Sequence, residues 1–199
     1  MSLATELIPN CHYAGISIVH RNRPIDTPAA TDELVRRGDE LQYAFGEGPC
    51  LDAIWHYDTV ISADLAQEDR WTRWAPCVAA ELKFHSMLCL RLFTSTELVG
   101  GLNLYSKEID AFDEDDAYTG TYLAAHIAVA VAATQQSDGI RIGALNRTII
   151  GQAQGILMER YKIDAEEAFN VMRRVSQDNN IKLIRVADEL VRTRRTPGA

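Results

Sequence analysis

The spacing of hydrophobic and polar residues changes about two-thirds of the way along this chain. Up to about residue 136, short alternating runs such as Ala14 to His20 are interleaved with segments of helical spacing. Beyond residue 143 the apolar residues recur at helical spacing throughout. The pattern predicts an α+β module over residues 1–136, a junction over 137–143 that contains Gly139 and Gly143, and an all-α module over 144–199.

The first module is predicted to be an antiparallel sheet with flanking helices, in the order β–β–α–α–β–α–β–β–α. Strands are predicted at 14–20, from residue 25, at 60–61, and as a hairpin over 86–93 and 98–105. Helices are predicted over 31–37, from Pro49, over 69–82, and from the acidic run 113–116 to about residue 136. Proline suits an early helical position, and acidic residues suit a helix N-terminus.

The second module is predicted to be a small bundle of three amphipathic helices. The first spans Asn146 to Tyr161, the second is opened by Asp164, and the third runs from Lys182 to about Thr193. Asp164 followed three residues later by a glutamate is a capping-box sequence. Asn179-Asn180 ends the second helix, since asparagine tolerates the left-handed conformation.

Charge is distributed unevenly between the two modules. The whole chain carries a net charge of −8, which by itself argues against a nucleic-acid partner. Residues 1–137 hold 9 Lys and Arg against 20 Asp and Glu, a net of −11, whereas residues 138–199 hold 11 against 8, a net of +3. The average therefore conceals an acidic module followed by a basic one.

Cysteine usage and hydropathy predict a cytoplasmic protein with no membrane partner. The four cysteines form no C-x-x-C pair, and the chain starts without a basic region followed by an apolar one. The uncharged stretch 117–137 has an apolar centre of only eleven residues, 123–133, which is too short to span a bilayer. Reduced and mostly buried thiols are the expectation.

Enzyme and metal-site signatures are absent from the sequence. There is no phosphate loop, no H-E-x-x-H and no G-x-S-x-G, and His56, His85 and His126 have no ligand spacing. Cys50 lies at a predicted helix start, where the pKa of a thiol tends to fall, so a redox role stays open beside the commoner role of a buried structural thiol. The sequence predicts no enzyme, no metal and no identified cofactor.

Several separated motifs in the last third of the chain resemble the ANTAR family. They are Ile149-Ile-Gly-Gln-Ala-Gln-Gly-Ile-Leu-Met-Glu-Arg160, Ala168-Phe169, Ser176-Gln177, Asn180-Ile-Lys-Leu183 and Val186-Ala187, and the resemblance covers about residues 140–194. ANTAR domains are three-helix RNA-binding antitermination domains, so the resemblance implies a stem–loop in a nascent transcript as the partner. The family usually has lysine where this chain has Gln154, which removes one candidate phosphate contact.

Residues 5–136 resemble a GAF sensory domain of the kind fused to ANTAR domains in actinobacteria. The matching segments are Ala14-Gly-Ile-Ser17, Gly46-Glu-Gly-Pro-Cys-Leu-Asp-Ala53, Asp69-Arg-Trp71, Gly100-Gly-Leu-Asn-Leu-Tyr105 and Ala111-Phe-Asp113. The resemblance implies a small-molecule pocket over the sheet; the sequence does not identify its ligand, and a vestigial pocket stays open. Only Thr5 to Ile8 precede the first strand, so the first helix is expected to be truncated and Met1 need not be the natural start.

Cations and amide side chains in the basic module are the candidate RNA contacts, since RNA binding needs cations for phosphates and polar groups for loop bases. The candidates are Gln152, Gln154, Arg160, Asn170, Arg173, Arg174, Gln177, Asn180, Lys182, Arg185 and Arg192. Glu189 lies among the cations of the last helix, so a salt-bridged solvated face is the alternative there. Phe169 and Ser176 are expected to pack or to bond the backbone rather than to face RNA.

Gly151 and Gly155 lie inside a predicted helix, where each glycine costs about 1 kcal/mol relative to alanine. Close approach of another helix, or of an RNA backbone, would offset that cost. Helix packing is the preferred interpretation.

Together these features favour a signal-responsive RNA-binding regulator of transcription antitermination. The alanine-rich helix that ends near residue 136 would transmit the signal, and its Leu123, Ile127 and Val131 would pair with a second copy in a homodimer, cover the sheet, or do both. One alternative is a helix-turn-helix regulator that binds DNA, although the turn at Asn179-Asn-Ile181 lacks the usual glycine. The other alternative is a protein-interaction module.

Overall fold

The computed structural model describes residues 2–20 and 22–195 and divides into two compact units, Met1–Ala133 and Thr134–Ala199. Residues 196–199, which the sequence assigns to the all-α module, lie outside the described residues.

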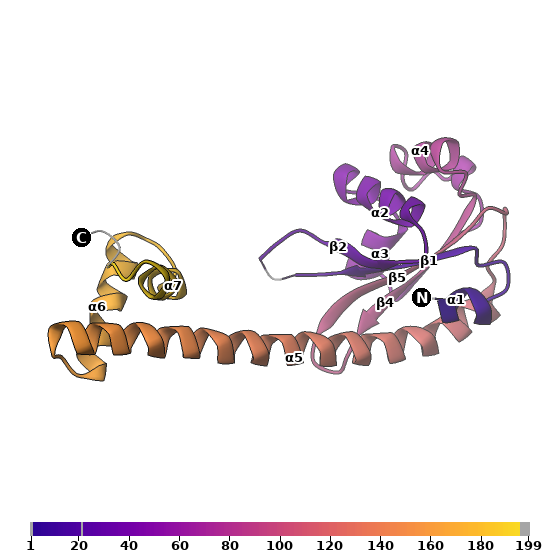
Figure 1. Ribbon diagram of the computed structural model, residues 1–199. Helices are drawn as coiled ribbons and strands as arrows, with labels where there is room; N and C mark the ends of the chain where they lie inside the picture. The colour runs from indigo at the N-terminus through magenta and orange to yellow at the C-terminus, as the bar shows by residue number, and fades with distance from the viewer. Residues whose placement is uncertain (1, 21, 196–199) are drawn as a thin grey trace. The chain divides into compact units, whose positions relative to one another are not determined.

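The N-terminal unit is a five-stranded antiparallel sheet with the strand order β2-β1-β5-β4-β3 (Figure 1). Its strands are β1 (Tyr13–Ile18), β2 (Asp26–Ala30), β3 (Thr59–Ser62), β4 (Ser86–Phe93) and β5 (Leu98–Ser106). Its helices are α1 (Ser2–Leu7), α2 (Glu33–Phe45), α3 (Pro49–Trp55), the 3-10 helix η1 (Leu65–Gln67), α4 (Trp74–Glu81) and the first part of α5 (Glu114–Tyr161). The predicted fold class is confirmed, and so is the predicted order of strands and α-helices from β1 onward; α1 and η1 were not in that order.

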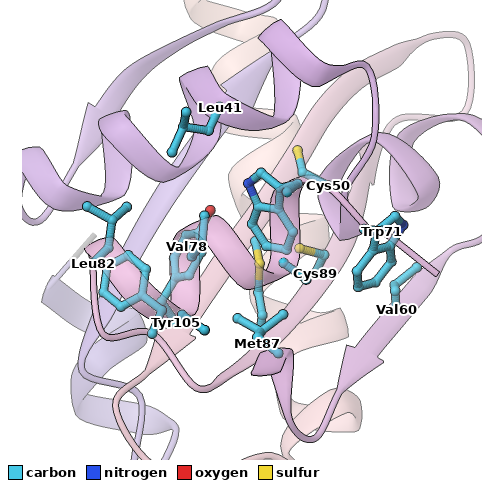
Figure 2. Packing of buried hydrophobic residues seen from close by; sticks show 14 of the residues in the cluster. Leu41, Cys50, Val60, Trp71, Val78, Leu82, Met87, Cys89 and Tyr105 are labelled. Atoms are coloured by element: carbon cyan, nitrogen blue, oxygen red, sulfur yellow. The ribbon is translucent and has the colours of Figure 1, made fainter. Parts of the chain in front are cut away.

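Both faces of the sheet are covered, which places an apolar core on each side. Helices α2, α3 and α4 cover one face, where Trp71, Trp74 and Tyr105 are buried among aliphatic and thiol side chains (Figures 1 and 2). Helices α1 and α5 cover the other face, where the core is aliphatic and includes Leu102 and Leu104. The cover on both sides explains why β4 and β5 are almost continuously apolar rather than alternating.

Local sequence signals set several of these boundaries. Asp32 accepts a hydrogen bond from the Leu34 N–H at the start of α2, and Gly46 ends the helix in the left-handed conformation. Pro49 stands in the first turn of α3, as expected. Pro28 is confined to β2, an edge strand, where its missing N–H removes no ladder hydrogen bond.

Two N-terminal helices differ in length from the prediction. The helix expected over 31–37 extends to Phe45, because its buried face continues through Leu41. The helix expected over 69–82 begins only at Trp74, since residues 69–73 form bends and turns. There the Trp71 indole N–H donates to Asp52 over 2.9 Å, a tertiary contact that the helical spacing of the tryptophans does not reveal.

Helix α5 is uninterrupted through residues 137–143, where the sequence predicted that one helix ends and another begins. An alanine Cβ at Gly139 or Gly143 would meet no atom within 4 Å, so neither glycine serves a close approach within the chain. Two isolated glycines weaken a helix by only about 1 kcal/mol each, which does not break a helix of 48 residues. The predicted helix end near Gln136 is therefore wrong.

The C-terminal unit consists of the last part of α5 with α6 (Ala165–Asp178) and α7 (Leu183–Thr193), which confirms the three-helix bundle. Its core contains Leu157 from α5, Met172 from α6 and Leu190 from α7, all almost fully buried. Both hydrogen bonds of the capping box at Asp164 are present. The turn after α6 passes through Asn180 in the left-handed conformation.

Candidate functional site

Helix α6 presents a polar arc on the side away from the apolar core of the C-terminal unit. Four predicted contacts lie on this arc and are exposed: Asn170, Arg173, Arg174 and Gln177. The helix rotates by 100° per residue, which puts these four within one arc opposite Ala168 and Met172. The two cations and two amides offer charge for phosphates and hydrogen-bonding groups for base edges.

Helix α7 adds three exposed cations outside its own apolar stripe. They are Lys182 at the N-cap position, Arg185 in the first turn and Arg192 in the last turn. Among the described residues, none of these three and neither arginine of the α6 arc has a carboxylate within 4.0 Å. Glu189 lies in the same arc without pairing with them, so the salt-bridged face that the sequence left open is not formed.

Two predicted RNA contacts instead hold the bundle together. The Gln154 side chain donates from Nε2 to the Ala165 carbonyl over 2.9 Å, which ties α5 to the start of α6. The Arg160 guanidinium donates from Nη2 to the Arg194 carbonyl at the end of α7. These bonds give both residues a structural use that the sequence did not indicate.

The remaining two candidates occupy different surroundings. Gln152 is exposed and lines an open groove of about 740 Å³ between α5 and α7, together with Gly155, Arg160 and Arg194. Asn180 is exposed with φ of 51°, so asparagine is explained there by backbone conformation alone. The expectation for Ser176 is confirmed, because its hydroxyl donates to the Ile181 carbonyl. Phe169 is half-buried against the core, also as expected.

The predicted helix packing over Gly151 and Gly155 is not found within the chain. A Cβ added at either position would meet no atom within 4 Å among the described residues. The two glycines lie on the side of α5 that faces away from the bundle, because α5 packs on α6 and α7 through the opposite side, which carries Ala153 and Leu157. The glycine side of α5 is therefore open surface in this unit.

Gly155→Ala is expected to raise the free energy of unfolding of the C-terminal unit by about 1 kcal/mol. The open space at this position lets a methyl group enter without a clash, and alanine loses less backbone entropy than glycine. Hydrogen exchange of the amides of Ala153 and Leu157 would measure the change. Gly151→Ala serves as the matched second variant, and a loss of protection in both would contradict the open face.

The N-terminal unit contains a buried polar network between the sheet and α2. Asp39 is fully buried, and its carboxylate accepts hydrogen bonds from Tyr105, Thr27 and Asn103 at 2.5, 2.8 and 3.0 Å. Gln42 donates to the same carboxylate over 3.4 Å. Donors from one helix and three strand positions therefore converge on a single carboxyl group.

The network continues to the hydroxyl and thiol groups beside it. Ser17 accepts from Asn103 at 2.8 Å and from the Cys50 thiol at 3.2 Å, and it bonds the Tyr43 hydroxyl at 2.6 Å. The Cys50 N–H donates to the Gln42 side chain over 2.8 Å. Among the described residues, the one buried side-chain nitrogen or oxygen without a partner is Nδ1 of His85, which lies outside this network. The chain's own side chains thus satisfy the polar interior over this face of the sheet.

Burial controls the ionisation of these groups. Burial raises the pKa of Asp39 to about 6, although the hydrogen bonds from Tyr105, Thr27 and Asn103 oppose the rise. Burial also raises the pKa of Cys50 to about 12 and that of Cys89 well above its usual value. Cys50 is therefore protonated at neutral pH, and the structure supports the buried structural thiol rather than the redox role.

Sequence reasoning missed this network, although a signal for it was available. Asp39 and Gln42 follow Val35 on α2 at the i, i+4 and i+7 positions of its buried face. A carboxylate and an amide at such positions indicate buried partners elsewhere in the fold. Their identity depends on β1, β2 and β5, which the pattern along α2 cannot show.

Leu123, Ile127 and Val131, the predicted dimer contacts, are half-buried against the core beneath the sheet of the same chain. They therefore cover the sheet, the second of the roles that the sequence allowed. The opposite side of α5 is exposed and carries Tyr118 and Tyr122, whose rings pack edge-on at 4.9 Å between centroids.

No helix within residues 2–20 and 22–195 is long and apolar enough to cross a membrane. In the same ranges, no group of three or more His, Cys, Asp or Glu side chains is arranged to hold a metal ion.

Comparison with protein families gives two matches that together cover most of the chain. The model of the GAF domain matches residues 1–132, and the model of the ANTAR domain matches residues 144–191. Comparison of the sequence with curated proteins gives no match.

Solved structures similar to this chain share the fold of the N-terminal unit. The type II free methionine-R-sulfoxide reductase from Thermoplasma acidophilum has a TM-score of 0.54 at 18% identity, over 66% of this chain and 86% of its own. The GAF domain/HD domain protein from Geobacter sulfurreducens has a TM-score of 0.53 at 14% identity, over 67% and 88%. The GAF domain from a phosphoenolpyruvate-protein phosphotransferase of Coxiella burnetii has a TM-score of 0.51 at 19% identity, over 65% and 76%.

Proposed function

The chain belongs to the GAF family and carries an ANTAR domain after its GAF domain, and from this order we propose that it is a signal-responsive RNA-binding regulator. The GAF domain would act as the sensor, and the ANTAR domain would promote transcription antitermination by holding a stem–loop in a nascent transcript. Such a protein works on RNA as it leaves the polymerase, so the proposed location is the cytoplasm. Both domains are regulatory, and we propose no catalytic activity.

The observation that carries the RNA-binding proposal is the set of unpaired cations on α6 and α7. Arg173, Arg174, Lys182, Arg185 and Arg192 are exposed and lack carboxylate partners among the described residues, so phosphates need not compete with internal ion pairs. Asn170 and Gln177 stand beside the α6 cations. Amide side chains can both donate to and accept from base edges in an unpaired loop.

Filter binding of the full chain to hairpin RNAs at several salt concentrations tests this function. If cations on α6 and α7 bind phosphates, the logarithm of the affinity should fall linearly with the logarithm of the salt concentration. Absence of salt-dependent binding by any hairpin, in every oligomeric state of the protein, would overturn the proposal.

DNA binding is the second candidate, and one structural observation favours it. The sequence argued against a helix-turn-helix because the turn between α6 and α7 lacks glycine. Asn180 nevertheless takes the left-handed conformation that glycine would supply, with φ of 51°. Competition with duplex DNA in the same filter assay separates the two candidates, since equal competition by DNA and hairpin RNA would favour the helix-turn-helix.

We propose that the chain forms a homodimer through α5, whose exposed side includes Tyr118 and Tyr122. Leu123, Ile127 and Val131 would contribute the parts of their side chains that the sheet does not cover. Sedimentation equilibrium is expected to show a dimer for the natural chain and a shift toward monomer for Tyr122→Glu, because two like charges would meet near the symmetry axis. Thr72→Glu, at an exposed position of the turn before α4 and away from α5, is the matched control, and a monomeric natural chain would contradict the proposal.

A further inference from the structure

The groove between α5 and α7 in the C-terminal unit has the size and lining of a ligand site. Its volume of about 740 Å³ falls within the range of about 300–1,000 Å³ that is typical of small-molecule sites. Its apolar part consists of Ile156 on α5 and Val191 on α7, both half-buried. Gly155 lines the groove without a side chain, and an added Cβ there would meet no atom within 4 Å.

Helical rotation places the lining residues of α5 along one side of the helix. At 100° per residue, Gln152, Ile156 and Glu159 lie within an arc of about 60°. Arg160 follows at the end of α5, about 12 Å from Gln152 along the helix axis at 1.5 Å per residue. An extended mononucleotide can bridge two such ends, with the base edge at one and the phosphate at the other.

Two arginines line the groove near the end of α5. Arg160 donates from Nη2 to the Arg194 carbonyl, which uses one of the five N–H donors of its guanidinium. Among the described residues, no carboxylate lies within 4.0 Å of either arginine side chain. Glu159 also lines the groove, but Lys162 pairs with it over 3.1 Å. The arginines therefore keep free donors for an anion, and guanidinium groups match the geometry of phosphate.

The other end of the groove offers a polar group of a different kind. The Gln152 side chain is exposed, and its amide makes no hydrogen bond with the other described residues. An amide both donates and accepts, as the edge of a nucleobase does. The apolar surface of Ile156 and Val191 lies between this amide and the arginines, where it can contact the face of a base.

We propose that this groove binds one nucleotide, with the base against Gly155, Ile156 and Val191 and the phosphate on Arg160 and Arg194. The amide at the other end would bond the edge of the base. Two sources supply this chemistry: a free mononucleotide, or an unpaired nucleotide of the RNA that the cations of α6 and α7 bind. The RNA source rests on the proposed function, whereas the binding of a mononucleotide does not.

Nuclear magnetic resonance of the full chain with ¹³C-labelled methyl groups tests the site, with adenosine 5′-monophosphate as the probe. The probe is expected to shift the methyl resonances of Ile156 and Val191 in a saturable manner, with a Kd of about 1 mM. Adenosine lacks the phosphate and is expected to bind at least about 10-fold more weakly, since it forms no charge-assisted hydrogen bond to the arginines. Ribose 5-phosphate lacks the base and is also expected to bind more weakly, since it leaves the apolar surface uncovered.

Two pairs of variants locate the bound nucleotide. Arg194→Gln is expected to weaken binding of the probe several-fold, whereas Arg195→Gln removes the same charge from a residue outside the lining and should leave binding unchanged. Gly155→Leu is expected to weaken binding at least about 10-fold, because the leucine side chain takes the space of the base. Gly151→Leu is its match one turn earlier, outside the lining, and leucine is a strong helix former at both positions.

Competition distinguishes the two sources of the nucleotide. Displacement of the probe by a single-stranded oligoadenylate at concentrations well below the Kd of the probe, but not by a blunt RNA duplex of the same length, would assign the groove to an unpaired nucleotide of RNA. Competition by the single strand no stronger than that of the mononucleotide would assign the groove to a free nucleotide. Equal displacement by the single strand and the duplex would contradict the placement of a base in the groove.

Three further results would overturn the inference: shifts that stay linear in probe concentration, equal binding of the probe and adenosine, or equal losses in Arg194→Gln and Arg195→Gln. Filter binding of hairpin RNA is measured without the probe, so the site and the proposed function fail separately. A chain that fails to bind hairpin RNA but binds the probe at Ile156 and Val191 would remove the proposed function and leave the site intact.

Discussion

Replacing Arg173, Lys182 and Arg185 together by glutamine is expected to weaken hairpin-RNA binding about 100-fold at about 0.15 M salt. Each phosphate contact contributes a slope of about 0.7 to 0.9 in the dependence of log affinity on log salt concentration, so the slope should become shallower by about 2 to 3. The three side chains are exposed, and helicity and the bundle core should be unchanged. Filter binding at several salt concentrations measures both quantities, and circular dichroism checks the fold.

The matched control removes three exposed cations from the N-terminal unit instead. Arg37→Gln, Lys83→Gln and Lys107→Gln together change the net charge by the same amount. If binding depends on the surface of α6 and α7, this control should retain the natural affinity and slope. Equal losses in both triple variants would show that net charge alone matters, which would contradict the assignment of the interface.

Asp39→Ala is expected to lower the free energy of unfolding of the N-terminal unit by about 3 kcal/mol. The substitution leaves the buried Tyr105 hydroxyl and Asn103 amide without the acceptor that they now share. All three tryptophans, Trp55, Trp71 and Trp74, belong to this unit, so tryptophan fluorescence during urea unfolding reports its stability alone. An unchanged midpoint would contradict the buried network.

Asp39→Asn separates the charge of this side chain from its hydrogen bonds. Burial raises the pKa of Asp39 to about 6 from a usual value near 4, so the folded state holds the proton more tightly than the unfolded state does. The free energy of unfolding of the natural chain should therefore fall by about 3 kcal/mol relative to that of Asp39→Asn as the pH rises from about 4 to about 6. Above about pH 6 the difference should be constant. The fold should tolerate asparagine at this position, because the side-chain oxygen can accept hydrogen bonds from Tyr105 and Asn103 while the side-chain amide donates to Thr27.

The stability difference between the natural chain and Asp39→Asn, measured by fluorescence at each pH, isolates Asp39 from the other carboxyl groups. Glu68, for example, titrates in both chains, and its pKa is lowered to about 2 by hydrogen bonds from Arg70. A difference that does not vary between pH 4 and 6 would show that Asp39 has an ordinary pKa in the folded protein.

Local signals predicted most of the secondary structure because the deciding interactions lie within a few residues. The capping box at Asp164 and the hairpin of β4 and β5 formed as predicted. The predicted helix end near Gln136 did not form, because isolated glycines destabilise a long helix only slightly. Before the late start of α4 at Trp74, the Trp71 indole bonds Asp52, a contact between residues 19 apart in the chain that helical spacing does not reveal.

The sequence placed the polar face of α6 and α7 correctly because helical rotation is a local property of the chain. It could not separate Gln154 and Arg160, which bond carbonyl groups of the bundle, from residues that remain unpaired. It also left open whether Glu189 pairs with the cations of α7, and whether another helix or RNA approaches Gly151 and Gly155 of α5. Those choices depend on neighbours from other helices, and spacing along one helix does not reveal them.

By itself the sequence determined the order of an acidic α+β module and a basic helical one, since periodicity, caps and charge are written along the chain. Only the tertiary structure decided that Asp39 is buried among donors from α2, β2 and β5, that Leu123, Ile127 and Val131 lie against the sheet, and that β4 extends past β3 beside α5. The physical reason is the same in each case. A side chain's burial and partners depend on segments distant in sequence, which come together only when the sheet and its helices have packed.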